Sequence, residues 1–135
     1  MGQKVNPHGM RVGINKDWSS KWYANNKDFS KYLESDLKIR KCLNKKLKDA
    51  AVSNININRD SKKTEVIIYT AKPGIVIGHG GEEIEKIKNE LCKLTGENVV
   101  VSIFEIKNPD MVAELVAQNI ARQIEARGSY RMAMK

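Results

Sequence analysis

The sequence predicts an α+β fold in which helices pack on three strands, with an N-terminal arm before this unit and a helix after it. Three observations predict this fold. Apolar residues recur at three- and four-residue steps over 28–50, they alternate with polar residues over 52–58, and a glycine-rich loop at 78–81 separates two later helical segments. The length of 135 residues suits one domain of ordinary size.

Residues 1–27 show no helical or strand period and are interpreted as an extended basic arm. Glycine and proline interrupt the segment, and it carries four lysines and one arginine. We expect such an arm to be disordered in isolation. Trp18, Trp22 and Tyr23 lie near its end, and two roles are open for these aromatic residues: they anchor the arm to a partner, or they pin it to its own domain.

A helical period begins at Asp28, which is a plausible N-cap, and continues to Ala50. The expected apolar face consists of Phe29, Tyr32, Leu33, Leu37, Leu43, Leu47 and Ala50. The other face carries a stripe of lysines, Lys31, Lys38, Lys41, Lys45, Lys46 and Lys48. A stripe of this kind is either solvated surface or a contact for an acidic polymer.

Two strands follow this helix as a hairpin. Residues 52–58 alternate apolar and polar side chains, residues 59–62 supply turn chemistry, and residues 64–70 are rich in β-branched and aromatic types. We expect Ile55 and Ile57 to face the helices. The opposite face of this strand would present Asn54, Asn56 and Asn58 to solvent or to another molecule.

A short helical turn is predicted from Pro73 to Ile77, and the loop at 78–81 separates it from a longer helix that ends at Gly96. The longer helix has an apolar stripe at three- and four-residue steps, formed by Ile84, Ile87, Leu91 and Leu94. Its first turn contains Glu82, Glu83 and Glu85, which suit the positive end of the helix dipole. A third strand is predicted over 99–106.

A last helix is predicted to begin at Asn108 and Pro109, a capping side chain followed by proline at the first helical position. The helical pattern continues toward the end of the chain with a disturbance at Gly128. We therefore divide the chain into the basic arm, 1–27, the α+β domain, 28–107, and a helix at 108–135 that leads into a further domain not contained in this sequence.

The charge of the chain is +8 and is unevenly distributed. Residues 1–72 hold 16 basic and 7 acidic side chains, a net of +9, whereas residues 73–135 hold 8 and 9, a net of −1. Lysine and arginine release condensed counterions when they meet phosphates, so this bias favours a nucleic-acid partner. Plain solubility is the alternative explanation.

Several function classes are disfavoured. No apolar run approaches the length of a membrane span, and no secretion signal is visible at the start. Cys42 and Cys92 are too far apart for a paired metal motif and indicate a reducing cytoplasm. We find no nucleophile motif, metal cluster or acid–base pair, so we expect no catalytic residue, no metal and no cofactor, and hence no enzyme.

The loop Ile77-Gly78-His79-Gly80-Gly81 fits the Ile-Gly-x-x-Gly signature of KH domains. Its glycines let the backbone turn sharply and approach a sugar-phosphate chain. The order of elements around it also fits a KH domain. A phosphate-binding loop starting at Gly74 would need glycine and lysine at positions 79 and 80, and a dinucleotide fingerprint would need glycine at position 83, so both alternatives fail on spacing.

Four segments resemble the bacterial small-subunit ribosomal protein S-three family: residues 1–7, 21–24, 72–78 and 131–135. The resemblance covers the whole chain in order. It implies a type II KH domain, αββααβ, built on a three-stranded mixed sheet that packs on helices, in the head of the small ribosomal subunit in the cytoplasm. The partners that it implies are 16S rRNA, mRNA and other ribosomal proteins of the head, with no membrane.

The resemblance also implies site residues. In the arm, RNA contacts fall on Gln3, Lys4, His8 and Arg11; in and before the loop, the candidate RNA-binding residues are Lys72, Ile77, Gly78, His79, Gly80 and Gly81. Arg131 and Lys135 match basic residues that line the channel through which mRNA enters the ribosome.

The sequence departs from this family at two sites and in length. Many relatives have two lysines where this loop has His79 and Gly80, and Met132 stands where arginine is common. The family also has a further C-terminal domain. Two alternatives to KH-mediated RNA binding remain: a KH-fold protein-interaction module that contacts RNA only through the arm, and, more remotely, an enzyme that cleaves nucleic-acid strands.

Overall fold

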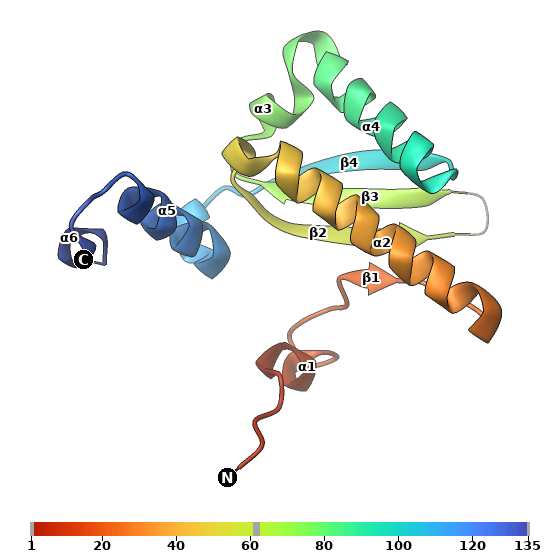
Figure 1. Cartoon of the computed structure of the whole chain (residues 1–135), viewed down its shortest axis with the longest axis horizontal. Coiled ribbons are helices and arrows are strands. Elements are labelled where there is room, and N and C mark those ends of the chain that lie inside the picture. The colour runs from red at the N-terminus through yellow and green to blue at the C-terminus, as the bar shows by residue number, and fades with distance from the viewer. Residues whose placement is uncertain (1, 61–62, 135) are drawn as a thin grey trace.

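Figure 1 shows the computed structural model, which describes residues 2–60 and 63–134. Its centre is a four-stranded sheet in the order β1-β2-β3-β4, with helices α2 and α4 on one face. The strands are β1 (Ser20–Lys21), β2 (Val52–Arg59), β3 (Thr64–Thr70) and β4 (Val99–Glu105), and the two covering helices are α2 (Asn26–Lys46) and α4 (Glu82–Thr95). The predicted α+β class is confirmed.

The register of the sheet places apolar side chains in rows across the helix-covered face. Strands β2 and β3 are antiparallel, with Ile57 opposite Val66, and β3 and β4 are parallel, with Ile68 opposite Ile103. This is the mixed sheet that the family resemblance implies. The fourth strand is an addition: β1 comes from the arm and pairs in parallel with β2. A two-residue strand carries no alternation that the sequence could reveal.

The core lies between α2, α4 and the sheet. Its fully buried side chains include Ile39 and Leu43 from α2, Leu91 from α4 and Ile57 and Ile68 from the strands. Burying one such side chain contributes about 1.5–3 kcal/mol, so this cluster is the main source of stability.

Helix α2 differs from the prediction in its bounds and its orientation. Asn25, not Asp28, is the N-cap, and the helix ends at Lys46, before a short 3₁₀ helix η1 (Lys48–Ala50). Leu33 and Leu37, predicted in the core, are 45% and 60% exposed, whereas Asp36 is only 3% exposed. Asp36 faces the interior because its carboxylate accepts hydrogen bonds from the buried guanidinium of Arg59 and from the indole N–H of Trp22.

The segment around the glycine loop follows the prediction. A short helix α3 (Pro73–Ile77) is followed by the 3₁₀ turn η2 (His79–Gly81) and then by α4, and Gly96 in the left-handed conformation ends α4. The predicted turn at 59–62 lies partly outside the described residues, because Ser61 and Lys62 are not described.

The C-terminal segment begins differently from the prediction. Pro109 starts a 3₁₀ turn η3 (Pro109–Met111), Val112 is extended, and the helix α5 (Ala113–Glu125) starts only after it; a last turn α6 (Tyr130–Ala133) follows. Figure 1 shows α5 and α6 beyond one end of the sheet. Helix α5 reaches the domain through Gln118, whose Nε2 donates to the carbonyl of Val52 at 3.1 Å.

Candidate nucleic-acid interface

The N-terminal arm contains a helical turn that the sequence did not predict. Helix α1 (Pro7–Arg11) is capped by Asn6, whose Oδ1 accepts a hydrogen bond from the backbone N–H of His8 at 2.9 Å. Proline at the first helical position has a fixed φ that favours this start. The Arg11 guanidinium donates back to the carbonyl of Pro7 at 2.9 Å. One turn is too short to leave a period in the sequence, and it gives the basic end of the arm a defined shape.

All four arm residues predicted to contact RNA are exposed: Gln3, Lys4, His8 and Arg11. Among the described residues, neither Lys4 nor Arg11 forms an ion pair with a carboxylate. Lys21, nearer the domain, pairs with Asp17. The far end of the arm therefore presents cations that are free to neutralise phosphates.

The two tryptophans of the arm have different surroundings. Trp22 is half-buried, and its ring lies 5.4 Å from Phe29 and 5.7 Å from Tyr32, measured between centroids. Its Nε1–H donates to Asp36 at 2.8 Å. Trp18 is 62% exposed. Of the two roles that the sequence left open, pinning of the arm to its own domain is correct for Trp22, and Trp18 remains available to a partner.

The lysine stripe, which runs along α2 and ends at Lys48 in η1, is partly neutralised. Lys31 pairs with Asp28, Lys38 with Glu34, and Lys46 with Glu90 of α4. The remaining members of the stripe, Lys41, Lys45 and Lys48, are exposed and have no carboxylate partner in the described part of the chain. The unpaired positive charge therefore gathers toward the C-terminal end of α2.

The glycine loop has the backbone that its sequence predicts. Gly78, Gly80 and Gly81 have φ values of 71°, 63° and 88°, which favour glycine. His79 and Gly80 are exposed at the tip, and Ile77 just before it is 41% exposed. The tip of the turn is thus open to an approaching nucleotide strand, whereas Gly78 and Gly81 at its base are half-buried.

Acidic side chains beside this loop disfavour phosphate binding, although the backbone conformation of the loop would allow it. Gly78 packs against Glu83, and Glu82 N–H, at the start of α4, already donates to the carbonyl of His79. Glu83 accepts a hydrogen bond from Lys86 at 2.7 Å, and this bond lowers the pKa of Glu83 and keeps its carboxylate ionised. Negative charge here offsets the positive end of the helix dipole.

The predicted site residues do not converge on one surface. In Figure 1 the loop between α3 and α4 lies beyond the β4 edge of the sheet, whereas the short helix α1 lies beyond the opposite edge, at β1. Helix α6 lies apart from both. Lys72 lines a cavity of about 660 Å³ together with Ala133 and Met134 of the C-terminal segment. Arg131 is exposed on α6, and Lys135 lies outside the described residues. The structure brings together Lys72 and the C-terminal turn, but not the arm and the loop.

Residues 2–60 and 63–134 contain no group of three or more side chains that could hold a metal ion. They also contain no helix that is both long and apolar enough to cross a bilayer.

The element order around an exposed glycine turn defines a type II KH domain. The sequence model of the KH domain matches residues 38–111, more than half of the chain, and the chain belongs to the KH domain family.

Relatives with known names are similar over the full chain. The small ribosomal subunit protein uS3 of Agathobacter rectalis is 62% identical over 135 residues, and those of Pediococcus pentosaceus and Clostridium acetobutylicum are each 55% identical. The chain spans only 60–62% of the length of these relatives. The resemblance inferred from the sequence is confirmed, and the prediction of a non-enzyme agrees with these names.

Sequence reasoning missed three charged residues that fix the arm: Asp36, Arg40 and Arg59. Asp36 and Arg40 are one helical turn apart on α2, and both contact the arm. A usable signal existed, since Asp36 interrupts the apolar positions of α2. Its partners, however, lie 14 and 23 residues away in sequence and could not be paired with it from spacing alone.

Proposed function

We propose that this chain is part of a structural protein of the small ribosomal subunit head, where it binds 16S rRNA through its basic arm and its KH domain. The observation that carries the proposal is the cationic, exposed far end of an arm that is docked on a KH domain. The similarity to proteins named as small-subunit ribosomal proteins supports it. The working location would be the cytoplasmic ribosome, with other head proteins as neighbours.

Binding would rest mainly on the RNA backbone. Lys4 and Arg11 meet phosphates, and the unpaired lysines at the end of α2 extend the positive surface. At the loop, the contribution comes from close backbone approach at Gly78 to Gly81 rather than from side-chain charge, since His79 stands at the tip. Shape recognition with little base reading is the expected mode.

A salt titration of RNA binding tests this proposal. The logarithm of the affinity should fall steeply with the logarithm of the salt concentration, and Lys4→Glu together with Arg11→Glu should flatten that slope by about one to two. Lys21→Glu serves as a matched control, because Lys21 already pairs with Asp17. An affinity that does not depend on salt would contradict the proposal.

In a second candidate function, the arm alone contacts RNA and the glycine loop binds a protein partner. The carboxylates in the first turn of α4, which include Glu83 beside Gly78, favour this alternative. RNA crosslinking separates the two: adducts confined to residues 1–50 support the protein-facing loop, whereas adducts at 77–81 support the KH loop as an RNA contact.

We further propose that Arg131 and Lys135 contribute to the channel through which mRNA enters, within a longer protein whose C-terminal domain follows residues 108–135. Arg131 is exposed on α6, as this role requires. In the longer protein assembled into ribosomes, Arg131→Glu should weaken mRNA loading without reducing assembly into subunits. Unchanged loading would reject the role of this residue.

A further inference from the structure

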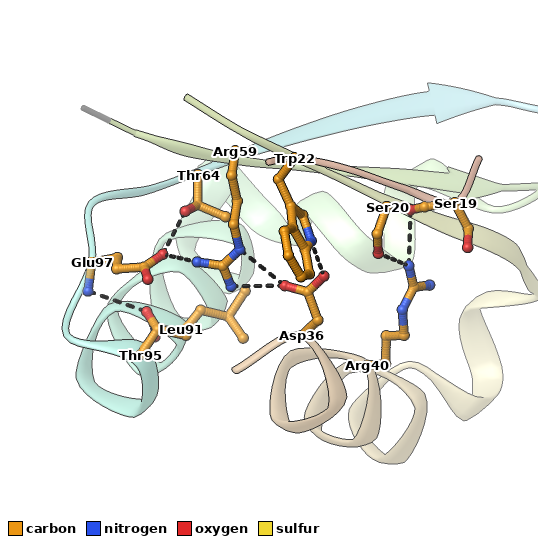
Figure 2. Close-up of polar contacts among 10 residues, drawn as sticks. All are labelled: Ser19, Ser20, Trp22, Asp36, Arg40, Arg59, Thr64, Leu91, Thr95 and Glu97. Carbon is orange, nitrogen blue, oxygen red and sulfur yellow. Dashed lines mark hydrogen bonds and ion pairs between the residues drawn. The ribbon is translucent and has the colours of Figure 1, made fainter. Parts of the chain in front are cut away.

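The arm is held on the domain at two adjacent points, both on α2 (Figure 2). At the first point Trp22 donates its Nε1–H to Oδ2 of Asp36, while its ring packs beside Phe29 and Tyr32. This contact joins a residue of the arm to a carboxylate that is only 3% exposed. It therefore fixes the arm to a part of the helix that cannot shift without disturbing the core.

Asp36 is itself held by Arg59 at the end of β2. The guanidinium donates from Nε and Nη2 to Oδ1 of Asp36, at 3.1 and 2.7 Å, and also pairs with Glu97. The same guanidinium lies 4.9 Å above the ring of Tyr32. Burial alone would lower the pKa of Arg59, but the bonds to Asp36 and Glu97 outweigh it and raise that pKa, so the guanidinium stays charged.

At the second point Arg40, one turn further along α2, holds the segment before Trp22. Its Nη2 donates to the carbonyl of Ser19 at 2.8 Å and to Oγ of Ser20 at 2.9 Å, and its Nη1 donates to the carbonyl of Ile55 at 2.6 Å. The carbonyl of Ser19 also accepts the backbone N–H of Ile57. One guanidinium thus links α2, β1 and β2.

From this clamp the chain leads directly to the cationic end of the arm. A tight turn follows α1, in which the backbone N–H groups of Asn15 and Lys16 both donate to the carbonyl of Arg11. Gly13 N–H donates to the carbonyl of Lys16 and closes the same turn. Most residues between Arg11 and Ser19 form hydrogen bonds within this segment, which limits its bending. The direction of α1 therefore depends on where Ser19 to Trp22 are held.

We propose that Asp36 and Arg40 are positioning residues that clamp the arm at Trp22 and Ser19–Ser20, so that residues 3–11 are presented to RNA in a fixed direction before RNA binds. This inference rests on the proposed function for its RNA component, but the clamp itself is a property of the free protein. Neither residue needs to touch RNA. Holding a binding segment in its bound orientation raises affinity because less freedom is lost on binding.

Two single variants test the clamp, one at each point. Trp22→Phe keeps an aromatic ring beside Phe29 and Tyr32 but removes the N–H donor, and Arg40→Lys keeps the charge but removes the fork that reaches Ser19, Ser20 and Ile55 together. Neither side chain belongs to the hydrophobic core. Glu34→Gln, on the exposed side of α2, is the matched control because Glu34 pairs, within residues 2–60 and 63–134, with Lys38 alone.

The first measurement is amide hydrogen exchange in the free, full chain. We expect exchange of the arm amides of Ser20 to Trp22 and of Ile57, where β1 pairs with β2, to accelerate by about tenfold in both variants and to stay unchanged in Glu34→Gln, while core amides of β3 stay protected. If arm amides exchange at the wild-type rate in both variants, the clamp does not exist. If one variant also loses protection in β3, its domain is unfolding as a whole, and the result of the other variant decides whether the clamp exists.

The second measurement is the affinity for an rRNA fragment over a salt series. We expect each variant to weaken binding by about 3- to 10-fold with the salt slope unchanged, because the same cations still reach phosphates once the arm is bound. A smaller slope would mean that the loosened arm brings fewer cations to phosphates and would contradict this expectation, and an unchanged affinity with a loosened arm would reject the positioning role. A wild-type chain that does not bind RNA would reject the proposed function and this role, whereas the exchange result would still decide the clamp.

Discussion

Gly78 and Glu83 approach so closely that a Cβ on Gly78 would lie 2.6 Å from Cγ and 2.9 Å from Cβ of Glu83. The glycine at the end of α3 is therefore needed for the packing of α4. Substitutions at this position should change stability and the proposed RNA binding together, so the loop has to be tested at its tip, where His79 is exposed.

Replacing Gly78 by alanine should destabilise the fold. The methyl group would overlap Glu83, and φ at this position is 71°, so the free energy of unfolding should fall by about 1–3 kcal/mol. Gly74→Ala is the matched control, since its Cβ would meet nothing within 4 Å inside helix α3. Urea unfolding of both variants measures the difference. Equal midpoints would show that α4 adjusts freely around residue 78.

Placing a lysine at the loop tip should strengthen RNA binding without changing the fold. His79→Lys adds a full positive charge on an exposed side chain beside the turn, and one further phosphate contact would steepen the salt slope by about 0.7–0.9. His79→Gln keeps a polar side chain without charge and serves as the control. An identical slope for all three proteins would favour the protein-facing loop.

The agreement between sequence and structure is best where a regular pattern covers a whole element. Alternation identified β2 and predicted that Ile55 and Ile57 face the helices, and the glycine spacing located the turn after Ile77. These features depend on neighbours in sequence, and a sequence displays them directly.

The failures share a different physical cause. Leu33 and Leu37 were assigned to the core by period alone, yet the orientation of α2 is set by Asp36, whose partners come from the arm and from β2. The wide separation of the arm from the loop also arises from tertiary arrangement. Residues that pair over a long distance in the sequence have no characteristic spacing by which they could be predicted. The KH signature, for its part, does not specify the charge at position 83.

Removing the buried carboxylate of α2 should cost much more stability than removing an exposed one. Asp36→Ala leaves Arg59 buried with Glu97 as its one remaining ion-pair partner in the described part of the chain, and we expect a loss of about 3 kcal/mol in the free energy of unfolding. Glu34→Ala, which breaks the exposed pair with Lys38, should have a clearly smaller effect. Denaturant unfolding compares the two, and similar losses would mean that the Asp36–Arg59 pair adds no more than a surface bridge.

The thiol of Cys42 should resist alkylation at neutral pH. Burial raises the pKa of Cys42 above its ordinary value of 9.0, and the negative charge of Glu90 adds to this shift, so less thiolate is present at a given pH. Because the folded-state pKa is above the unfolded one, the associated stability is present below pH 9 and is lost as the pH rises through the folded-state pKa. Iodoacetamide labelling of a Cys92→Ala variant between pH 7 and pH 10 tests this, with urea-unfolded protein as the reference. We expect slower labelling of the folded chain and a rate profile displaced to higher pH; a profile that coincides with that of the unfolded chain would contradict the shift.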